Sequence, residues 1–392
     1  MSDVTSMHER KVAPQAPLPR AIAALQSGMD AGLHIGAQLY VSLQGQTVAD
    51  LGVGESRPGI QMSRDSLMIW FSCTKAVTAV ALAQMWERGK LDLDDPACRY
   101  VPEFGANGKH VITIRHLLTH TGGFRFADGF GTRRGPFSVS WEENIARICE
   151  AEIETGWIPG GRAGYHPTSS MFIVGEIVRR VDGRTFDRYV REEIFEPLGM
   201  TDSWIGMPPT VYRAYGARIG IMHNTERDAP RPLPETDSEA VCTRCVPGAN
   251  GRGPMRELGH FYEMLLFRGE RRGVRLLRPP TVEAITARHR VGMMDETLRV
   301  VVDWGLGFAI DAALYGRHAS PRTFGHGGAQ SSVAFADPER GVVVALVTNG
   351  MPGRDRHYPR FEAISSAIYE DLGLAEPGSE GRRHPMPAAG LT

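Results

Sequence analysis

The chain has 392 residues, of which 42% are hydrophobic and 23% charged, and its formal net charge is −1. These values are typical of a globular protein that can bury a sizeable core. The balanced charge argues against electrostatic binding of nucleic acid or of a membrane surface, so we expect neither as a partner. No stretch approaches the ~20 apolar residues needed to span a bilayer.

Residues 1–18 and 376–392 are rich in proline, glycine and charge and are expected to form loose tails. The N-terminal tail has no apolar segment of the kind found in secretory signals, which favours a cytoplasmic location. There the five cysteines should be reduced. Cys242 and Cys245 have the spacing of a redox or zinc pair, but no second pair accompanies them, and we interpret them as loop thiols.

The first elements along the chain are a helix and a hairpin. Residues 19–31 predict an amphipathic helix, and residues 36–43 and 47–54 flank the short turn Gln44-Gly45-Gln46 as a β-hairpin. The segment that begins at Ser72 is apolar on nearly every side, which predicts a buried helix. Gly89 is expected just past its C-terminus.

Helical patterns dominate the middle of the chain, and strand patterns follow. Helices are predicted within residues 112–123, 169–183, 187–200 and 255–270, strands within 304–311, 331–337 and 341–349, and a last helix over 361–372. Strands near both ends with helices between them predict an α/β domain built from residues 19–90 and 291–375. A mainly helical insert, residues 91–290, interrupts it.

The motif Ser72-Cys73-Thr74-Lys75 opens the buried helix. The spacing of three places Ser72 and Lys75 on one helical face. A desolvated lysine has a lowered pKa and can act as a base beside a serine nucleophile, an arrangement that indicates acyl transfer. An isolated S-x-x-K match is more often a helix-capping serine followed by a solvated lysine, so further parts of a site are needed.

Further stretches supply those parts. They are RHLLTHTGG (115–123), PGGRAGYHPTSSMFIVGEIVRRVDG (159–183), FEPLGM (195–200), WGLGF (304–308) and FGHGGAQSS (324–332). Together with the S-x-x-K motif, they make residues 33–374 resemble the serine β-lactamase and penicillin-binding-protein superfamily, in the class C-like branch that includes family VIII carboxylesterases and transacylases. The resemblance implies an α+β sandwich, an antiparallel sheet flanked by helices, with the site between it and the helical insert.

Tyr165 stands where this branch has the tyrosine of its Y-x-N motif. The resemblance implies that Tyr165 and Lys75 together take the proton of Ser72 and return it to the leaving group. Which of the two is the base stays open, because coupled groups titrate as a unit. The alternative for Tyr165 is a tyrosine at the edge of the core with its hydroxyl bonded to backbone.

The chain departs from the family pattern at Pro167, which replaces the asparagine of Y-x-N. Proline has no side-chain hydrogen bond to offer, so contacts of that asparagine with Lys75 and with a substrate amide must be lost or replaced. Thr168, Ser169 and His166 are candidates to replace them. The loss argues against efficient hydrolysis of β-lactams.

His326, Gly327 and Gly328 occupy the K-T-G position. The resemblance implies that this strand lies beside the nucleophile helix and that the backbone N–H groups of Ser72 and Ala329 form an oxyanion hole. Histidine is near neutral at pH 7, unlike the lysine it replaces, which favours neutral esters or amides over carboxylate-bearing substrates.

His116 and His120 are four residues apart in a predicted helix, a spacing that could bind zinc. No acidic residue lies between them as in H-E-x-x-H, and the stretch matches the family's structural turn. We therefore expect neither a metal nor another cofactor.

The sequence thus predicts a serine acyl-enzyme hydrolase that acts on carboxylic esters or amides of small molecules. A small-molecule acyl donor is the expected partner. The alternative is an acyltransferase that passes the acyl group from Ser72 to an alcohol or amine. A non-catalytic binding protein with the same fold is a more remote alternative. The sequence gives no oligomeric state.

Overall fold

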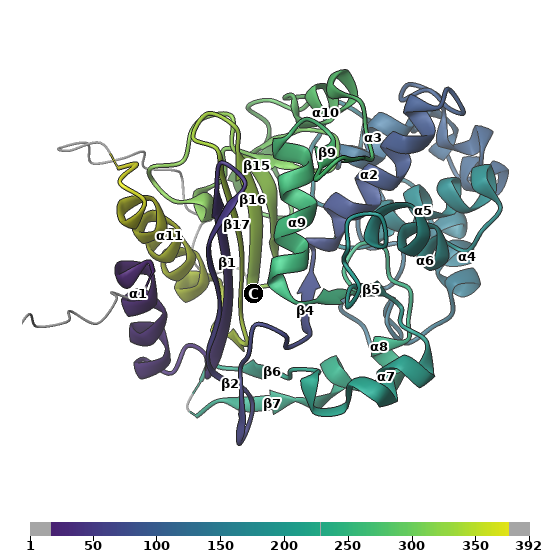
Figure 1. Cartoon of the computed structure of the whole chain (residues 1–392). Coiled ribbons are helices and arrows are strands. Elements are labelled where there is room, and N and C mark those ends of the chain that lie inside the picture. Colours follow the sequence, from purple (N-terminus) through teal and green to yellow (C-terminus); the bar gives the residue numbers. More distant parts are fainter. Residues whose placement is uncertain (1–16, 228, 376–392) are drawn as a thin grey trace, which may run out of the picture.

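The computed structural model describes residues 17–227 and 229–375, so the predicted tails, apart from residues 17 and 18, lie outside the described residues. A large antiparallel sheet carries helices on both of its faces, and a helical part adjoins one side (Figure 1). The predicted fold class, an antiparallel sheet flanked by helices, is confirmed.

The helices are α1 (Pro19–Asp30), α2 (Thr74–Glu87), α3 (Ile114–Leu118), α4 (Trp141–Glu150), α5 (Ser169–Asp182), α6 (Phe186–Val190), α7 (Pro209–Tyr215), α8 (Glu239–Cys242), α9 (Met255–Leu266), α10 (Pro279–Thr286) and α11 (Arg354–Asp371). The large sheet has the order β13 (Asp303–Trp304), β14 (Ala309–Ile310), β15 (Phe324–Gly328), β16 (Ser332–Asp337), β17 (Val342–Thr348), β1 (Gly36–Leu43), β2 (Gln46–Arg57) and β3 (Ile60–Gln61). A small sheet joins β4 (Met68–Phe71), β8 (Gly251–Gly253) and β5 (Trp204–Ile205), a second joins β18 (Gly350–Met351), β6 (Met222–Asn224) and β7 (Arg231–Leu233), and two hairpins pair β9 (Glu270–Arg271) with β10 (Val274–Arg275) and β11 (Met294–Asp295) with β12 (Val300–Val301).

The sheet joins the two ends of the chain at β1 and β17, which pair antiparallel. The predicted hairpin is β1–β2, and its turn residues Gln44 and Gly45 both have positive φ, the conformation that a tight hairpin turn requires. The division into an α/β domain and a helical insert stays a prediction. Within residues 91–290, α9 packs against β1, β16 and β17.

Strand β17 is apolar from Val342 to Val347 because both faces of the sheet are covered. Val343 and Val347 belong to the core on the side of α9, whereas Val344 and Leu346 belong to the core under α1 and α11 (Figure 1). Successive strand residues point to opposite faces, so two cores require an uninterrupted apolar run. In the described part of the chain, no helix combines the length and apolar character needed to cross a membrane.

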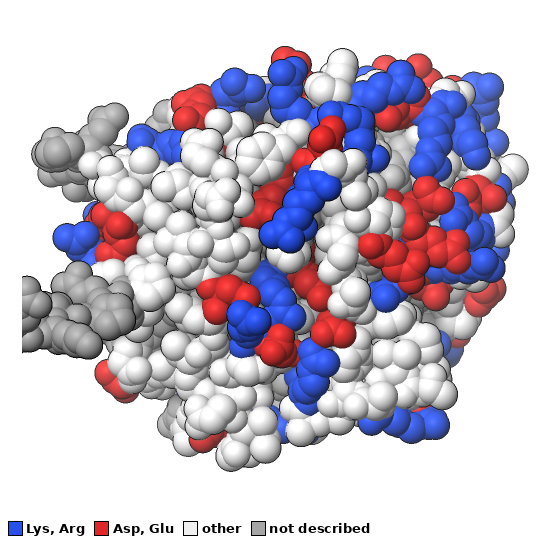
Figure 2. Space-filling model, in the orientation of Figure 1, with Lys and Arg blue, Asp and Glu red and all other residues white. Residues whose placement is uncertain are grey.

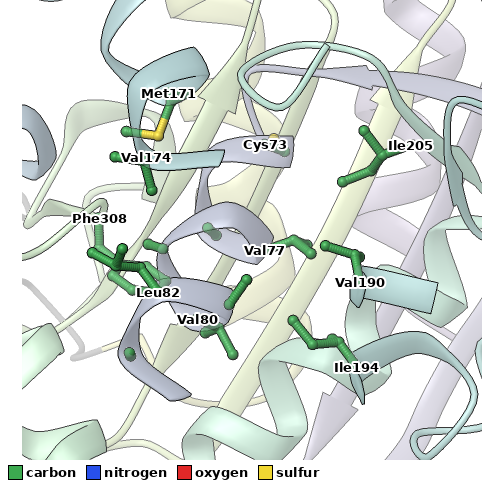
Figure 3. Close-up of a cluster of buried hydrophobic side chains, with 14 of the residues drawn as sticks. Cys73, Val77, Val80, Leu82, Met171, Val174, Val190, Ile194, Ile205 and Phe308 are labelled. Carbon is green, nitrogen blue, oxygen red and sulfur yellow. The ribbon is translucent and has the colours of Figure 1, made fainter. Parts of the chain in front are cut away.

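Helix α2 is buried on nearly every side, as predicted. Figure 3 shows Val77 and Val80 of α2 beside Val190 of α6 and Ile194 of the π-helical turn that follows it. The helix ends at Glu87, and Gly89 follows with φ 68°, the left-handed conformation expected of a residue just past a helix. This packing fixes the start of α2 rigidly in the interior.

Two predicted helices differ from the structure. The helix predicted over 187–200 is α-helical only to Val190 and then π-helical over Arg191–Phe195. The last helix begins at Arg354 and includes Pro359, where the sequence pattern predicted a start after the proline.

On the face shown in Figure 2, basic and acidic side chains are interspersed, mainly over the helical part, as the near-zero net charge suggests.

Candidate active site

Ser72 lies in the tight turn between β4 and α2. The sequence predicted a helix that begins at Ser72, whereas α2 begins at Thr74. Phe71 directly before it has φ 46°, a conformation that costs a non-glycine residue about 1–3 kcal/mol and persists only when neighbours enforce it. Thr74 supplies that restraint, because its hydroxyl donates to the Phe71 carbonyl (2.5 Å) and accepts from the Gly251 N–H (2.8 Å). The turn leaves Ser72 half-exposed at the start of a buried helix.

Lys75 is fully buried, and its Nζ has three oxygen neighbours. Nζ lies 3.0 Å from Ser72 Oγ, 2.6 Å from the Pro167 carbonyl oxygen and 2.8 Å from the Gly248 carbonyl oxygen. Burial lowers the pKa of Lys75 to about 7. A neutral amine has two N–H donors for the two carbonyls and one lone pair for the Ser72 hydroxyl. The amine is therefore able to accept the Ser72 proton near neutral pH.

Tyr165 is buried with its ring centroid 4.8 Å from Lys75 Nζ. Burial raises the pKa of Tyr165 well above its usual range, and a hydrogen bond with the Ser72 hydroxyl offsets part of that rise. The phenol is therefore protonated at neutral pH. Of the two groups left open by the sequence, Lys75 is the one with a pKa suited to a base, and the phenol is suited to pass a proton on.

An ion pair behind the site anchors Tyr165. The Tyr165 N–H donates to Asp295 Oδ1 (2.9 Å), and the other carboxylate oxygen lies 3.1 Å from Arg290 in a pair shielded from solvent. Trp304 packs against the Tyr165 ring (5.8 Å between centroids) and beneath the Arg290 guanidinium (5.2 Å). Asp295 and Arg290 were not predicted, because nothing in the local sequence marks them as contacts of a residue about 130 positions away.

Strand β15 packs directly against the turn that carries Ser72. A Cβ on Gly328 would lie 2.3 Å from the Trp70 carbonyl oxygen and 3.1 Å from the Phe71 side chain. The Cys73 thiol donates to the His326 carbonyl (3.0 Å), which fixes the strand to the first residues of the helix. Ala329 follows Gly328 and is exposed. The structure thus brings the predicted K-T-G-like strand and the Ser72 turn together.

His326 projects into the buried side of the site. Its ring centroid lies 6.0 Å from that of Tyr165 and 5.4 Å from that of Trp304, and its Nδ1 is 2.6 Å from the Gly327 carbonyl. Burial, reinforced by Lys75, lowers the pKa of His326 to about 3. The histidine is therefore uncharged at neutral pH, and Nδ1 carries the hydrogen that bonds to Gly327.

His116 and His120 do not share a helix, which corrects the sequence interpretation. Helix α3 ends at Leu118, and His120 lies beyond it with φ 58°. His116 Nδ1 accepts from the Thr113 N–H and completes the cap of α3, while the buried His120 accepts from the His166 N–H. Both imidazoles have structural roles here, and His120 also packs against Tyr165 (4.6 Å between centroids).

Residue 167, where the family pattern led us to expect an asparagine, contacts Lys75 through its backbone. The backbone carbonyl of Pro167 binds Lys75, and none of the three side chains considered as substitutes does so: Thr168 bonds to Asp128, Ser169 to the Phe124 and Arg125 carbonyls, and His166 to the Phe124 N–H. Asp128 was not identified from the sequence. It is a buried carboxylate in the loop between α3 and α4.

Known proteins resemble this chain in sequence and in fold. The family model described as Beta-lactamase matches residues 21–367, a range that contains every residue of the site. Esterase/beta-lactamase LipL of Mycobacterium tuberculosis is 29% identical over 84% of this chain and 80% of its own length. Esterase EstB of Burkholderia gladioli is 27% identical over 86% of this chain and 91% of its own. The crystal structure of a family VIII carboxylesterase superposes with a TM-score of 0.78 at 26% identity, covering 92% of this chain and 98% of that one.

Proposed function

Because the chain belongs to the beta-lactamase family, we propose that it is a serine acyl-enzyme hydrolase acting on carboxylic esters or amides of small molecules. The observation that carries the proposal is the 3.0 Å approach of Lys75 Nζ to Ser72 Oγ, made by a buried amine whose pKa is lowered to about 7. A strongly shifted pKa beside a possible nucleophile is typical of functional sites. Similarity to proteins named as esterases supports the same reaction class.

In the proposed first step, Lys75 takes the Ser72 proton while Oγ attacks the substrate carbonyl carbon. The carbonyl oxygen becomes an oxyanion, which the backbone N–H groups of Ser72 and Ala329 stabilise. As the bond to the leaving group breaks, the proton passes to the departing oxygen or nitrogen from Lys75 through the Tyr165 hydroxyl. The leaving group departs as an alcohol or amine, and the acyl group stays on Ser72.

The second step removes the acyl group. Water attacks the acyl carbon, gives up a proton along the same route, and Ser72 recovers its hydrogen as the carboxylic acid leaves. If an alcohol or amine occupies the place of that water, the product is a new ester or amide and the protein is an acyltransferase. The two reactions share every group up to the acyl-Ser72 intermediate, so the acceptor alone distinguishes them.

Two features support neutral esters as the preferred donors. The His326 imidazole is uncharged at neutral pH and offers no cation for a carboxylate. Pro167 offers only its carbonyl, which Lys75 already occupies, so position 167 has no side-chain amide for the amide of a penicillin. Both features lower the expected activity towards β-lactams relative to esters.

A cytoplasmic location is part of the proposal, and fractionation of producing cells would test it.

The test is acylation by a short-chain ester. Incubation with p-nitrophenyl butyrate, followed by intact mass spectrometry, should give one butyryl adduct and steady release of nitrophenol. The variant Ser72→Ala should give neither, while Ser27→Ala, which changes an exposed serine on α1, should behave as the wild type. An adduct that persists in Ser72→Ala would refute the assignment. Adding alcohols or amines and measuring product partition then identifies the acceptor.

A further inference from the structure

Asp128 is a buried carboxylate that the steps above do not use. It lies between α3 and α4 with no exposed surface. Its Oδ2 accepts from the Thr168 hydroxyl (2.5 Å) and its Oδ1 from the Phe130 N–H (3.2 Å). Within the described residues, no arginine, lysine or histidine forms an ion pair with it. A carboxylate is costly to bury without a cation, so its location calls for an explanation.

The hydrogen bond from Thr168 connects Asp128 to the surroundings of Lys75. Thr168 directly follows Pro167, and the Pro167 carbonyl oxygen accepts from Lys75 Nζ at 2.6 Å. Asp128 therefore binds Thr168, and the residue before Thr168 binds Lys75. Burial raises the pKa of Asp128, and the Thr168 hydroxyl, the Phe130 N–H and the Lys75 charge offset part of that rise. The interaction is mutual: burial lowers the pKa of Lys75, and Cys73 and then Asp128 offset part of that fall.

The other titratable groups that face Lys75 carry no charge at neutral pH. Burial raises the pKa of the Cys73 thiol to about 12 and that of the Tyr165 phenol further. Burial also lowers the pKa of His326 to about 3 and that of His120 well below its ordinary value. Of the groups that interact electrostatically with Lys75, Asp128 is then the carboxyl group that can take a negative charge when Lys75 becomes an ammonium ion.

We propose that Asp128 is the counter-ion and positioning residue of Lys75, holding the Pro167 carbonyl against the Lys75 amine through Thr168. The inference rests on the proposed function, because it gives the lysine its anion at the moment when it takes the proton of Ser72. In that step a neutral amine becomes an ammonium ion in the interior. A nearby carboxylate stabilises that product and so lowers the barrier to acylation.

The composition of the chain allows a direct test. It contains four lysines, Lys11, Lys75, Lys90 and Lys109, so a protein labelled with ¹³C at lysine Cε gives four signals that can be titrated by NMR. The signal that disappears in Lys75→Met belongs to Lys75. This readout requires no catalytic turnover, so it separates failure of this proposal from failure of the proposed function, which the ester adduct reports.

Asp128→Asn removes the charge and keeps an oxygen that can accept from Thr168. We expect the pKa of Lys75 to fall by about one unit, since an opposite charge near a lysine favours its protonated form. The acid limb of kcat/KM should move to lower pH by the same amount, and the plateau should fall. Asp337→Asn is the matched control, because Asp337 is also buried and bonded to hydroxyls, those of Ser320 and Tyr369, at a distance from Lys75.

Thr168→Val tests the link itself and stands in if Asp128→Asn does not fold. Loss of the hydroxyl should lower the pKa of Lys75 by a smaller amount in the same direction and reduce kcat more than it changes KM. A folded Asp128→Asn or Thr168→Val protein whose Lys75 titrates as in the wild type would overturn the proposal. A shift of equal size in Asp337→Asn would overturn it as well, because the effect would then not depend on proximity.

Discussion

The carbonyl oxygen of Pro167 accepts a hydrogen bond from Lys75 at 2.6 Å. This contact uses the backbone of residue 167 and does not depend on its side chain. With the Gly248 carbonyl, the Pro167 carbonyl occupies two positions around the amine and leaves the third to Ser72.

Replacement of Lys75 by methionine should abolish the general base while keeping the volume of the side chain. We expect the rate of Ser72 acylation by p-nitrophenyl butyrate to fall about 10²–10⁴-fold. Stopped-flow release of nitrophenol measures that rate. Lys90→Met, at an exposed lysine just past the same helix, should leave it unchanged. Equal rates in Lys75→Met and the wild type would exclude Lys75 as the base.

The activity should depend on pH through Lys75. Since burial lowers the pKa of Lys75 to about 7, kcat/KM should rise tenfold per pH unit below that value and level off above about pH 8. A pH series of ester hydrolysis measures the acid limb, the part of the profile in which kcat/KM rises with pH. The pKa of His326 is lowered to about 3, so His326→Gln should leave the limb in place. A limb that moves in His326→Gln would contradict its assignment to Lys75.

Burial of Lys75 should lower the free energy of unfolding. Its folded-state pKa of about 7 lies below an unfolded value of about 10.4, so the unfolded chain binds more protons between these values and stability rises with pH there. The cost is fully present below about pH 7, where it reaches at most about 4–5 kcal/mol, and it is absent above about pH 10. Lys75→Met should therefore be more stable than the wild type at pH 6, and urea unfolding should show the difference shrinking towards pH 10.

Gly328→Ala tests the contact between β15 and the Ser72 turn. The added Cβ would lie 2.3 Å from the Trp70 carbonyl oxygen, so strand and turn must separate. We expect a loss of about 1–3 kcal/mol in unfolding free energy and a lower kcat. Gly161→Ala is the control, because its Cβ would meet nothing closer than 3.4 Å. Full activity in Gly328→Ala would argue against a role for this contact in holding the oxyanion hole.

Asp295→Ala should be among the most destabilising changes in the chain. It leaves the Arg290 guanidinium buried without its carboxylate, which typically costs about 3–5 kcal/mol, and removes the acceptor of the Tyr165 N–H. Chemical denaturation gives the loss. Asp30→Ala, at an exposed aspartate that accepts from the Gln26 side chain, should change stability by less than about 0.5 kcal/mol. Comparable losses in both variants would refute the importance of the buried pair.

Features that depend on local spacing could be predicted from the sequence. The alternating strands and the tight turn at Gln44-Gly45 predict the first hairpin, and an all-apolar helix with a lysine in its first turn predicts a buried amine beside Ser72. Steric rules and the helical and strand periods act over a few residues, so a short stretch contains the information they need.

The groups around that amine come from distant parts of the chain and could not be predicted in this way. The Pro167 and Gly248 carbonyls lie 92 and 173 positions from Lys75 in the chain, and Asp295 lies 130 from Tyr165. Every residue has a carbonyl, so no residue type indicates which one will become a ligand. Packing of distant segments selects it, and the same packing desolvates Lys75 and lowers its pKa to about 7. The pairing of Ser72 with Lys75 can be predicted from the sequence, whereas its chemistry depends on the burial of Lys75 in the folded chain.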